Sequence, residues 1–312
     1  MPRTHHLDAG TVHYEWNNAL AARLVVEPGD TVVFDTRDAA DRYYTRASTS
    51  ADAAARGAFR GHPLTGPVAV RGARPGDALV VEVLAVEPAE DFGWTAIRPG
   101  RGLLPESEFP AAFLQIWDLS DGKTARMVGR DVRVPQAPFP GVMGVALPEP
   151  GGHSTMPPRK NGGNMDVKLL TAGATLYLPV WVEGALFSVG DAHAAQGDGE
   201  VCVTAVEMSA RVTLGFGLER GAAPPEPRLR TRRAPNGAAD SWFVTTAHGP
   251  DLYASAQQAI RYMIAHLVQE RGLTREEAYV LASVAVDLRI SEIVDAPNWI
   301  VSAVLPESVF GS

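Results

Sequence analysis

The feature that most constrains the fold is the spacing of turn residues. The chain contains 30 glycines and 24 prolines, which recur at short intervals between runs rich in valine. Three such runs cover 30–36, 66–72 and 77–88, and each partly alternates between apolar and polar residues. Short runs of this kind between turn residues are typical of an all-β sandwich or barrel. We therefore predict a mainly β fold, sandwich- or barrel-like.

The middle of the chain continues this pattern. Four more strand-like runs follow there: 174–182, 185–193, 200–218 and 241–248. Residues 219–240 are rich in Pro and Arg and lack periodicity, so they predict a long connection or a domain boundary. We expect the basic run 228–235 within them to be a solvated loop.

After residue 250 the apolar residues recur at helical spacing. They form one stripe: Ala256, Ala259, Ile260, Met263, Ile264, Leu267 and Val268. This stripe puts His266 on the polar side of the helix. Gly272 is a plausible helix stop, and Thr274 with Glu277 forms a capping box for a second helix. A strand-like run at 298–306 completes a smaller C-terminal α+β part.

These changes along the chain divide it into three predicted segments. We expect an N-terminal β-sandwich-like domain over 1–160 and a central β region that carries the site over 161–249. A C-terminal helix pair plus strand over 250–312 follows.

Composition narrows the class of protein. A net charge of −8 argues against nucleic acid and anionic membranes as partners. No apolar run approaches the length of a membrane span, and the first residues lack the apolar region of a secretory signal. The single cysteine, Cys202, excludes a disulfide framework and a Cys-based zinc cluster. We expect a cytoplasmic protein.

Residues 190–201, GDAHAAQGDGEV, concentrate acidic side chains and an imidazole among small residues. If 185–193 is a strand, Asp191 and His193 project to one face because side chains alternate. If a strand restarts at Glu200, that glutamate faces the same cleft, whereas Val201 and Val203 face the core. The alternative is a polar, Gly-rich turn whose aspartates cap the backbone.

A site of this composition suits metal and acid–base chemistry. A histidine and carboxylates at close range can ligate a divalent cation, and a further carboxylate can act as general base. D-x-H is less specific than the H-E-x-x-H pattern. The segment 157–168 contributes Asn164 and Asp166 to the same cleft, or else forms a hairpin turn with charged edges. Asp38 follows the strand 31–36, where a carboxylate can reach a site or cap a turn.

Cys202 permits a competing mechanism. With Glu200 or Glu183 as base and Lys168 as partner, it would form a thiol amidase site. A lone cysteine in a valine-rich run is more often a small buried apolar residue.

Residues 161–202 carry a longer pattern: GGNMD, then LYLPV, then GALFSVGDAHAAQGDGEV. This order resembles the central signature of the acetamidase/formamidase family. Four further stretches resemble the same family: 13–39, 62–83, 93–104 and 287–306. The pattern has two departures, since Asn17 replaces an aspartate and Val203 replaces a glycine.

The resemblance implies hydrolysis of a short-chain amide, such as formamide or acetamide, to ammonia and a carboxylic acid. It also implies a mainly β fold, a homo-oligomer (dimer or higher) and a divalent metal ion, zinc or calcium. Six positions match recurrent family residues: Asp38, Asp166, Asp191, His193, Asp198 and Glu200.

From this resemblance we assign hypothetical roles. Four residues are the expected metal ligands: His193, Asp191, Asp166 and Asp38. Glu200 is the expected general base, with Asp198 as the alternative and His193 as a further catalytic residue. Four residues are expected to contact the substrate: Asn164, Gly163, Gln196 and Trp94. The N–H groups of Gly162, Gly163 and Gly197 are expected to face the oxyanion. A β-sandwich that binds a small ligand without turnover is the rival from another class.

Overall fold

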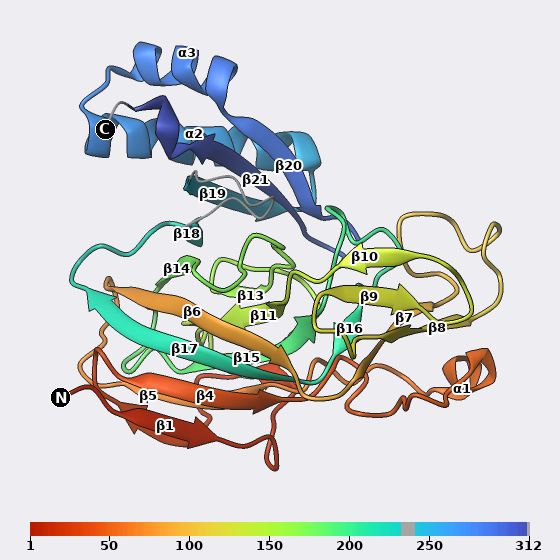
Figure 1. The fold of residues 1–312 in the computed structure, drawn as a ribbon. Coiled ribbons are helices and arrows are strands. Elements are labelled where there is room, and N and C mark those ends of the chain that lie inside the picture. The colour runs from red at the N-terminus through yellow and green to blue at the C-terminus, as the bar shows by residue number, and fades with distance from the viewer. Residues whose placement is uncertain (232–240, 311–312) are drawn as a thin grey trace.

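Two large β-sheets make up most of the computed structural model, which describes residues 1–231 and 241–310 (Figure 1). The nine strands of the first sheet are, in spatial order, β1 (Thr4–Leu7), β4 (Thr31–Thr36), β17 (Ala210–Glu219), β6 (Ala78–Pro88), β14 (Thr175–Pro179), β18 (Arg228–Arg230), β19 (Trp242–Gly249), β21 (Trp299–Pro306) and β20 (Asp287–Glu292). The sequence segments 1–160, 161–249 and 250–312 all contribute strands to it.

The second sheet carries the shorter strands. Its main path is β10 (Arg133–Pro135), β9 (Thr124–Met127), β8 (Phe113–Asp118), β7 (Phe92–Ile97), β16 (Glu207–Met208), β15 (Phe187–His193), β11 (Phe139–Gly144) and β13 (Gly162–Asn164). β5 (Thr65–Val70) pairs with β15, and β3 (Leu24–Val26) pairs with β5. A separate ribbon joins β2 (Glu15–Trp16) to β12 (His153–Ser154), and the short helix α1 (Ser50–Ala55) lies after β4.

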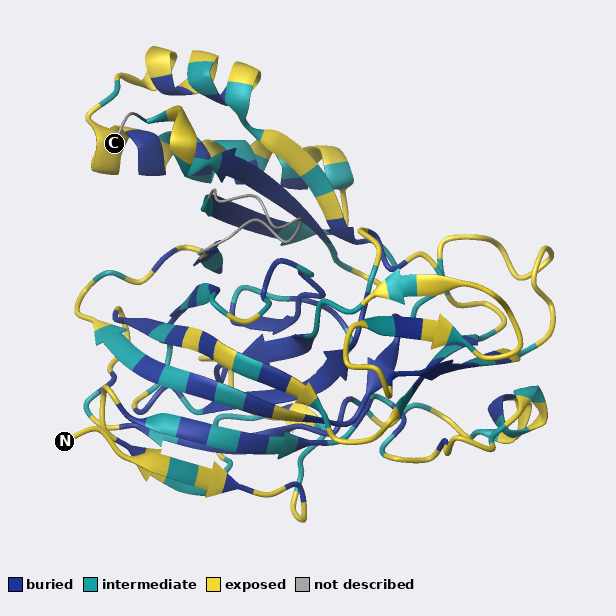
Figure 2. Cartoon of the chain, viewed as in Figure 1, coloured by how far each residue is buried: buried dark blue, intermediate teal, exposed yellow. Residues whose placement is uncertain are grey.

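The core lies between the two sheets. β4 and β17 alternate between buried and more exposed residues, so one face of the first sheet is apolar. Phe34 from that face packs edge to face on Phe187 of the second sheet. β15 is buried along its whole length, as the dark interior strands of Figure 2 show. Neither sheet closes on itself in the described residues, so the predicted mainly β fold is confirmed as a sandwich rather than a barrel.

The predicted C-terminal α+β part is also confirmed. Helices α2 (Leu252–Arg271) and α3 (Arg275–Ala285) pack against β19 and β21 at the top of Figure 1. Gly272 ends α2 with φ +67°, and its N–H donates to the carbonyl of Val268. Thr274 and Glu277 form the predicted capping box of α3. A 3₁₀ turn at Glu307–Val309 follows β21.

His266 corrects one sequence-based prediction. It is not on the polar side of α2 but buried, with its ring stacked on Phe243 at 3.5 Å between centroids. Burial, together with the charges of Arg228, Arg230 and Arg271, lowers the pKa of His266 to about 4. A neutral imidazole therefore packs in the apolar layer between α2 and β19.

We expect acid to destabilise the protein through this histidine. Its pKa is about 4 in the folded state and about 6.5 when unfolded. Its stabilising contribution is therefore complete above about pH 6.5 and is lost as the pH falls toward about 4. The full difference is about 3 kcal/mol, which screening by solvent reduces to on the order of 2 kcal/mol. Urea unfolding at about pH 7.5 and about pH 4.5 measures this loss. His266→Leu should show a smaller loss, and an equal loss in both proteins would contradict the assignment.

The run 200–218 is not one continuous strand, which corrects another prediction. Residues 200–202 lie in turns, and the strands begin only at Glu207 and Ala210. Val201 is 55% exposed and does not enter the core. Gly199 and Glu200 both have positive φ, so the chain turns there instead of extending.

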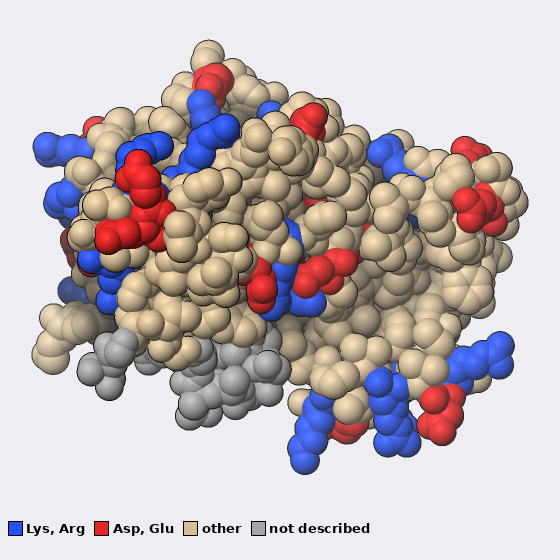
Figure 3. Space-filling view, turned by 90° about the horizontal axis from the view of Figure 1, so that it is seen from above, with Lys and Arg blue, Asp and Glu red and all other residues tan. Residues whose placement is uncertain are grey.

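The basic run 228–235 is only partly described. Residues 228–230 form β18 rather than a solvated loop, and residues 232–240 lie outside the described residues. On the face shown in Figure 3, acidic and basic side chains are interspersed. Among the described helices, none is long and apolar enough to cross a membrane.

Candidate active site

Strand β15 brings Asp191 and His193 to one side of the second sheet. Phe187 and Val189 belong to the core, and so do Ala192 and Ala194, so the alternation of the strand changes near Asp191. Asp191 has φ +54°, a left-handed conformation that non-glycine residues seldom adopt. The change leaves Asp191 and His193 facing away from the core, with His193 Nε2 3.6 Å from Asp191 Oδ1.

Two neighbouring loops add the next carboxylates. Asp166 follows β13 with φ +47°, and its Oδ1 lies 3.7 Å from His193 Nδ1. Glu200 lies in the turn after β15, also with φ +47°, and is 7% exposed. Left-handed backbone at several residues of one site is strain that the surrounding packing must hold.

Gln196 orients the imidazole of His193. Its Nε2 donates to the carbonyl of Asp166 at 2.8 Å, which leaves its Oε1 2.9 Å from His193 Nδ1. The Nδ1–H of His193 therefore donates to Gln196, and Nε2 faces the carboxylates. This contact positions the ring as outer-shell partners of metal-bound histidines do. Gln196 does not line the cavity beside the acids, and its contact with substrate stays a prediction.

Glu207 is a central residue of the site that the sequence analysis missed. It lies on β16 opposite His193 and Trp94, and its Oε2 is 3.2 Å from His193 Nε2. Its Oε1 accepts the N–H of Ala205 at 2.9 Å. The available signal was an acidic residue inside an otherwise apolar run, in AVEMSA.

Three further site residues come from distant parts of the chain and were also missed. Asp295, in the loop between β20 and β21, accepts a hydrogen bond from Asn164 Nδ2. Glu292 accepts the N–H of Asp295 at 2.5 Å. His62 Nε2 lies 3.6 Å from Asp191 Oδ2. No local pattern connects these positions in the sequence.

Six buried residues together form an acid cluster: Asp166, Asp191, His193, Glu200, Glu207 and Asp295. Burial raises the pKa of Asp166 to about 6 and that of Glu207 to about 8. Burial also holds the pKa values of Glu200 and Asp295 well above the usual range. Burial therefore favours the protonated form of four of the five carboxyl groups.

Two members of the acid cluster are shifted the other way by charge. Burial opposes the ionisation of Asp191, but the imidazoles of His62 and His193 lower its pKa. Burial also opposes a charge on His193, yet the carboxylates of Glu207 and Asp191 raise its pKa well above the usual value. A proton on His193, or a cation among these side chains, offsets the same negative charge.

The acid cluster fits a divalent cation. Three overlapping sets of its side chains have ligand atoms within 4.8 Å of one another: Asp166, Asp191 and His193; His193, Glu200 and Glu207; Asp166, Glu200 and Asp295. Four buried atoms in it have no hydrogen-bond partner: Asp166 Oδ1, Asp191 Oδ1, His193 Nε2 and Glu207 Oε2. Unpartnered buried polar atoms are costly unless something binds them.

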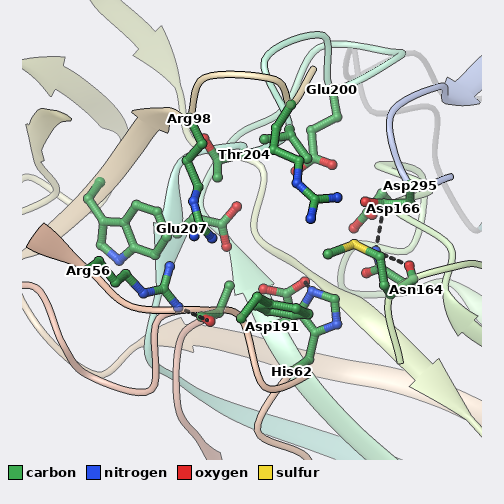
Figure 4. A pocket seen from close by; sticks show the side chains of 16 residues that line it. Arg56, His62, Arg98, Asn164, Asp166, Asp191, Glu200, Thr204, Glu207 and Asp295 are labelled. Atoms are coloured by element: carbon green, nitrogen blue, oxygen red, sulfur yellow. Dashed lines mark hydrogen bonds and ion pairs between the residues drawn. The ribbon is translucent and has the colours of Figure 1, made fainter. Parts of the chain in front are cut away.

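A small cavity of about 50 Å³ ends on this cluster (Figure 4). Its other lining includes Trp94, Asn164, Val203 and Thr204. The space exceeds the roughly 10–15 Å³ that a single buried water needs, so it can hold a small polar ligand. Buried acids, an oriented imidazole and a small cavity define an enzyme site suited to acid–base and cation chemistry.

Several expected site residues lie elsewhere. Asp38 caps its own turn by accepting the N–H groups of Ala40 and Arg42, and it is absent from the candidate metal sets. Asp198 is exposed and pairs with Lys168 at 3.0 Å. The structure therefore leaves Asp38 outside the metal site and Asp198 outside the cavity.

The glycines expected for the oxyanion contacts and the cysteine of the thiol site do not line the cavity of the acid cluster, so both roles stay predictions. The N–H of Gly162 donates to the carbonyl of Arg159, and Gly197 is exposed. Gly163 is buried, but a side chain there would point at Trp16. Cys202 lies beside an apolar surface hollow with Leu103 and Leu104, and it does not line the cavity of the acid cluster.

Comparison with known proteins matches nearly the whole chain to one family. The model of the acetamidase/formamidase family matches residues 2–150 and 149–312. A formamidase of Methylophilus methylotrophus is 27% identical and aligns over 96% of this chain and 90% of its own length. An acetamidase of Mycolicibacterium smegmatis is also 27% identical, over 67% of this chain and 66% of its own. The crystal structure of an acetamidase from Bacillus halodurans is 31% identical, covers 98% of both chains and superposes with a TM-score of 0.87.

The chain therefore belongs to the acetamidase/formamidase family. It is an amidohydrolase that acts on linear amides.

Proposed function

We propose that the protein hydrolyses short-chain amides of the formamide and acetamide class with the help of a divalent cation. The observation that carries this proposal is the set of buried acids around His193 at the end of a small cavity, because these groups supply both cation ligands and a general base beside a bound substrate. The relatives named formamidase and acetamidase support the same substrate class.

Asp166, Asp191 and His193 would hold the cation, with Glu207 completing the set. A mixture of imidazole and carboxylate donors suits zinc, and the number of carboxylates also suits calcium. When bound, such a cation lowers the pKa of water and polarises a carbonyl group.

Glu200 is the proposed general base. Its carboxyl lines the cavity beside the proposed cation ligands, and burial raises its pKa, so its ionised form is a stronger base than an exposed glutamate. In that form it takes a proton from water and passes it to the leaving nitrogen. The water oxygen bonds to the amide carbon, the C–N bond breaks, and the nitrogen leaves as ammonia with the transferred proton. Asn164 Oδ1, buried and unpartnered, can accept a hydrogen bond from the substrate amide. Trp94 bounds the cavity on the apolar side.

Removal of the cation should abolish activity. We expect ammonia release from formamide and acetamide to fall by at least about 100-fold after dialysis against a chelator, and to return with zinc or calcium. The melting temperature should fall as well, because a ligand of the folded state stabilises it. Metal analysis of the purified protein gives the identity of the ion. Full activity in metal-free protein would contradict the cation, and no turnover of any short amide would favour a binding protein instead.

Val203 is expected to limit substrate length. It lines the cavity with φ +72°, where a β-branched residue is strained and glycine is not. Val203→Gly should therefore fold normally and raise the ratio of kcat/KM for butyramide over acetamide by about 10-fold. Val201→Gly is the control, since Val201 is exposed and outside the cavity. An equal change in both variants would contradict a role for the Val203 side chain.

We also propose a homo-oligomer located in the cytoplasm. Two exposed apolar areas support self-association: Leu103, Leu104, Phe109 and Val201 form one, and Tyr253, Tyr279 and Leu288 form the other. The single cysteine suits a reducing compartment. Light scattering after size exclusion should give a mass of at least two chains, and a monomer would overturn the oligomer.

A further inference from the structure

Three arginines line the same cavity as the acid cluster. Arg56, Arg98 and Arg101 form this arginine group. Arg56 and Arg98 are half-buried, and Arg101 is exposed. In Figure 4, Arg56 and Arg98 lie on the side of the cavity opposite Asp166 and Asp295.

Five carboxyl groups line the same cavity, yet the arginine group forms no ion pair with any of them in the described residues. None of its guanidinium groups lies within 4.0 Å of a carboxylate oxygen there. Arg56 instead donates to the carbonyl of Ala39 at 3.1 Å and lies over the ring of Tyr44. Arg98 donates to the carbonyl of Gly57 at 3.5 Å. Both guanidinium groups keep donors free for a ligand, because each carries five N–H groups.

The arginines also repel one another. Burial lowers the pKa of Arg98, and the neighbouring charges of Arg56 and Arg101 lower it further. Like charges held together at a half-buried site are unfavourable unless an anion joins them. Guanidinium groups bind carboxylates strongly because two parallel hydrogen bonds match the geometry of the anion.

From this placement we infer that the preferred substrate is a short amide with a carboxylate at its other end, such as malonamate. This inference rests on the proposed amide hydrolysis and adds the substrate class. The amide end lies against the acid cluster, and the carboxylate lies against Arg56 and Arg98. Water adds to the amide carbon, the C–N bond breaks, ammonia leaves, and the distal carboxylate is unchanged. Malonamate thus gives malonate and ammonia.

The unmodified protein provides the first test. We expect kcat/KM for malonamate to exceed that for isovaleramide by at least about 10-fold, because the two have the same heavy-atom shape but differ in charge. Oxamate and succinamate then report the preferred length. Equal or better use of isovaleramide would overturn the inference while leaving amide hydrolysis intact. Absence of turnover with every amide, neutral ones included, would instead overturn the proposed function.

Variants provide the second test. In Arg56→Gln/Arg98→Gln, the ratio of kcat/KM for malonamate over isovaleramide should fall by about 10- to 100-fold. Arg60→Gln is the matched control, since Arg60 lies over the Tyr14 ring and outside the cavity. An unchanged ratio in the folded double variant, or an equal fall in the control, would overturn the inference. The substrate comparison in the unmodified protein decides the question if the double variant does not fold.

Discussion

Glu200→Gln is expected to lower kcat for acetamide by about 100- to 10,000-fold, the range for loss of a general base. Glutamine keeps the shape of the side chain but cannot take a proton from water. Glu200 is buried at the end of the cavity, and burial raises its pKa, which makes its ionised form a stronger base. KM should change much less than kcat, because the substituted group acts in the transition state.

Asp198→Asn is the matched control for this prediction. Asp198 lies two residues before Glu200 in the same loop, but it is exposed and paired with Lys168. Its substitution should change kcat by less than about threefold, because exposed ion pairs contribute little. If Asp198→Asn loses the activity and Glu200→Gln keeps it, the assignment of the base is reversed.

The fold and half of the site could be predicted from local patterns. The alternation of residues 185–193 predicts that Asp191 and His193 share a face, and the structure brings them together. Capping rules predict that α2 ends at Gly272 and that α3 begins after Thr274. These predictions depend on interactions within a few residues, which a single sequence displays directly.

The rest of the site depends on contacts between distant segments. Glu207, Asp295 and His62 reach His193 or its neighbours only through sheet pairing and loops. Glu200 was expected on a regular strand, whereas a left-handed residue turns the chain there. Asp38 matched a family position, yet its carboxylate is used to cap a turn. Only tertiary structure distinguishes a capping carboxylate from a ligand.

Net charge predicts recognition at the cavity less well than the charges that line it. The charge of −8 argues against nucleic acid and anionic membranes as partners but does not describe the site. Acids and arginines instead line the cavity together, with Glu207 on the same side as Arg56 and Arg98 in Figure 4. Because charges interact mainly over short distances in water with salt, the lining of a cavity determines recognition more than the total does.

Gly141→Ala tests whether the acid cluster needs the close approach of β11 to β15. A Cβ at residue 141 would lie 2.7 Å from His193 Cε1 and closer still to Asp166 Oδ1. Neither neighbour can move freely, because His193 is held by Gln196 and Asp166 has left-handed backbone. We expect a loss of about 1–3 kcal/mol in the free energy of unfolding from overpacking. Displacement of these two groups should also lower kcat by at least about 100-fold.

Gly215→Ala on β17 is the control: it adds a methyl group to a strand without displacing a site residue. A Cβ at Gly215 would meet its nearest neighbour, Glu82, at 3.5 Å, an ordinary van der Waals distance. Both variants add the same atoms to a strand, so both gain the same strand propensity. Only Gly141→Ala should lose activity and bound metal, measured by ammonia release and metal analysis of the folded protein. Equal activity in the two variants would mean that the acid cluster tolerates a shift of His193 and Asp166. The proposed cation ligands would then be wrong, because a metal site is sensitive to displacements of this size.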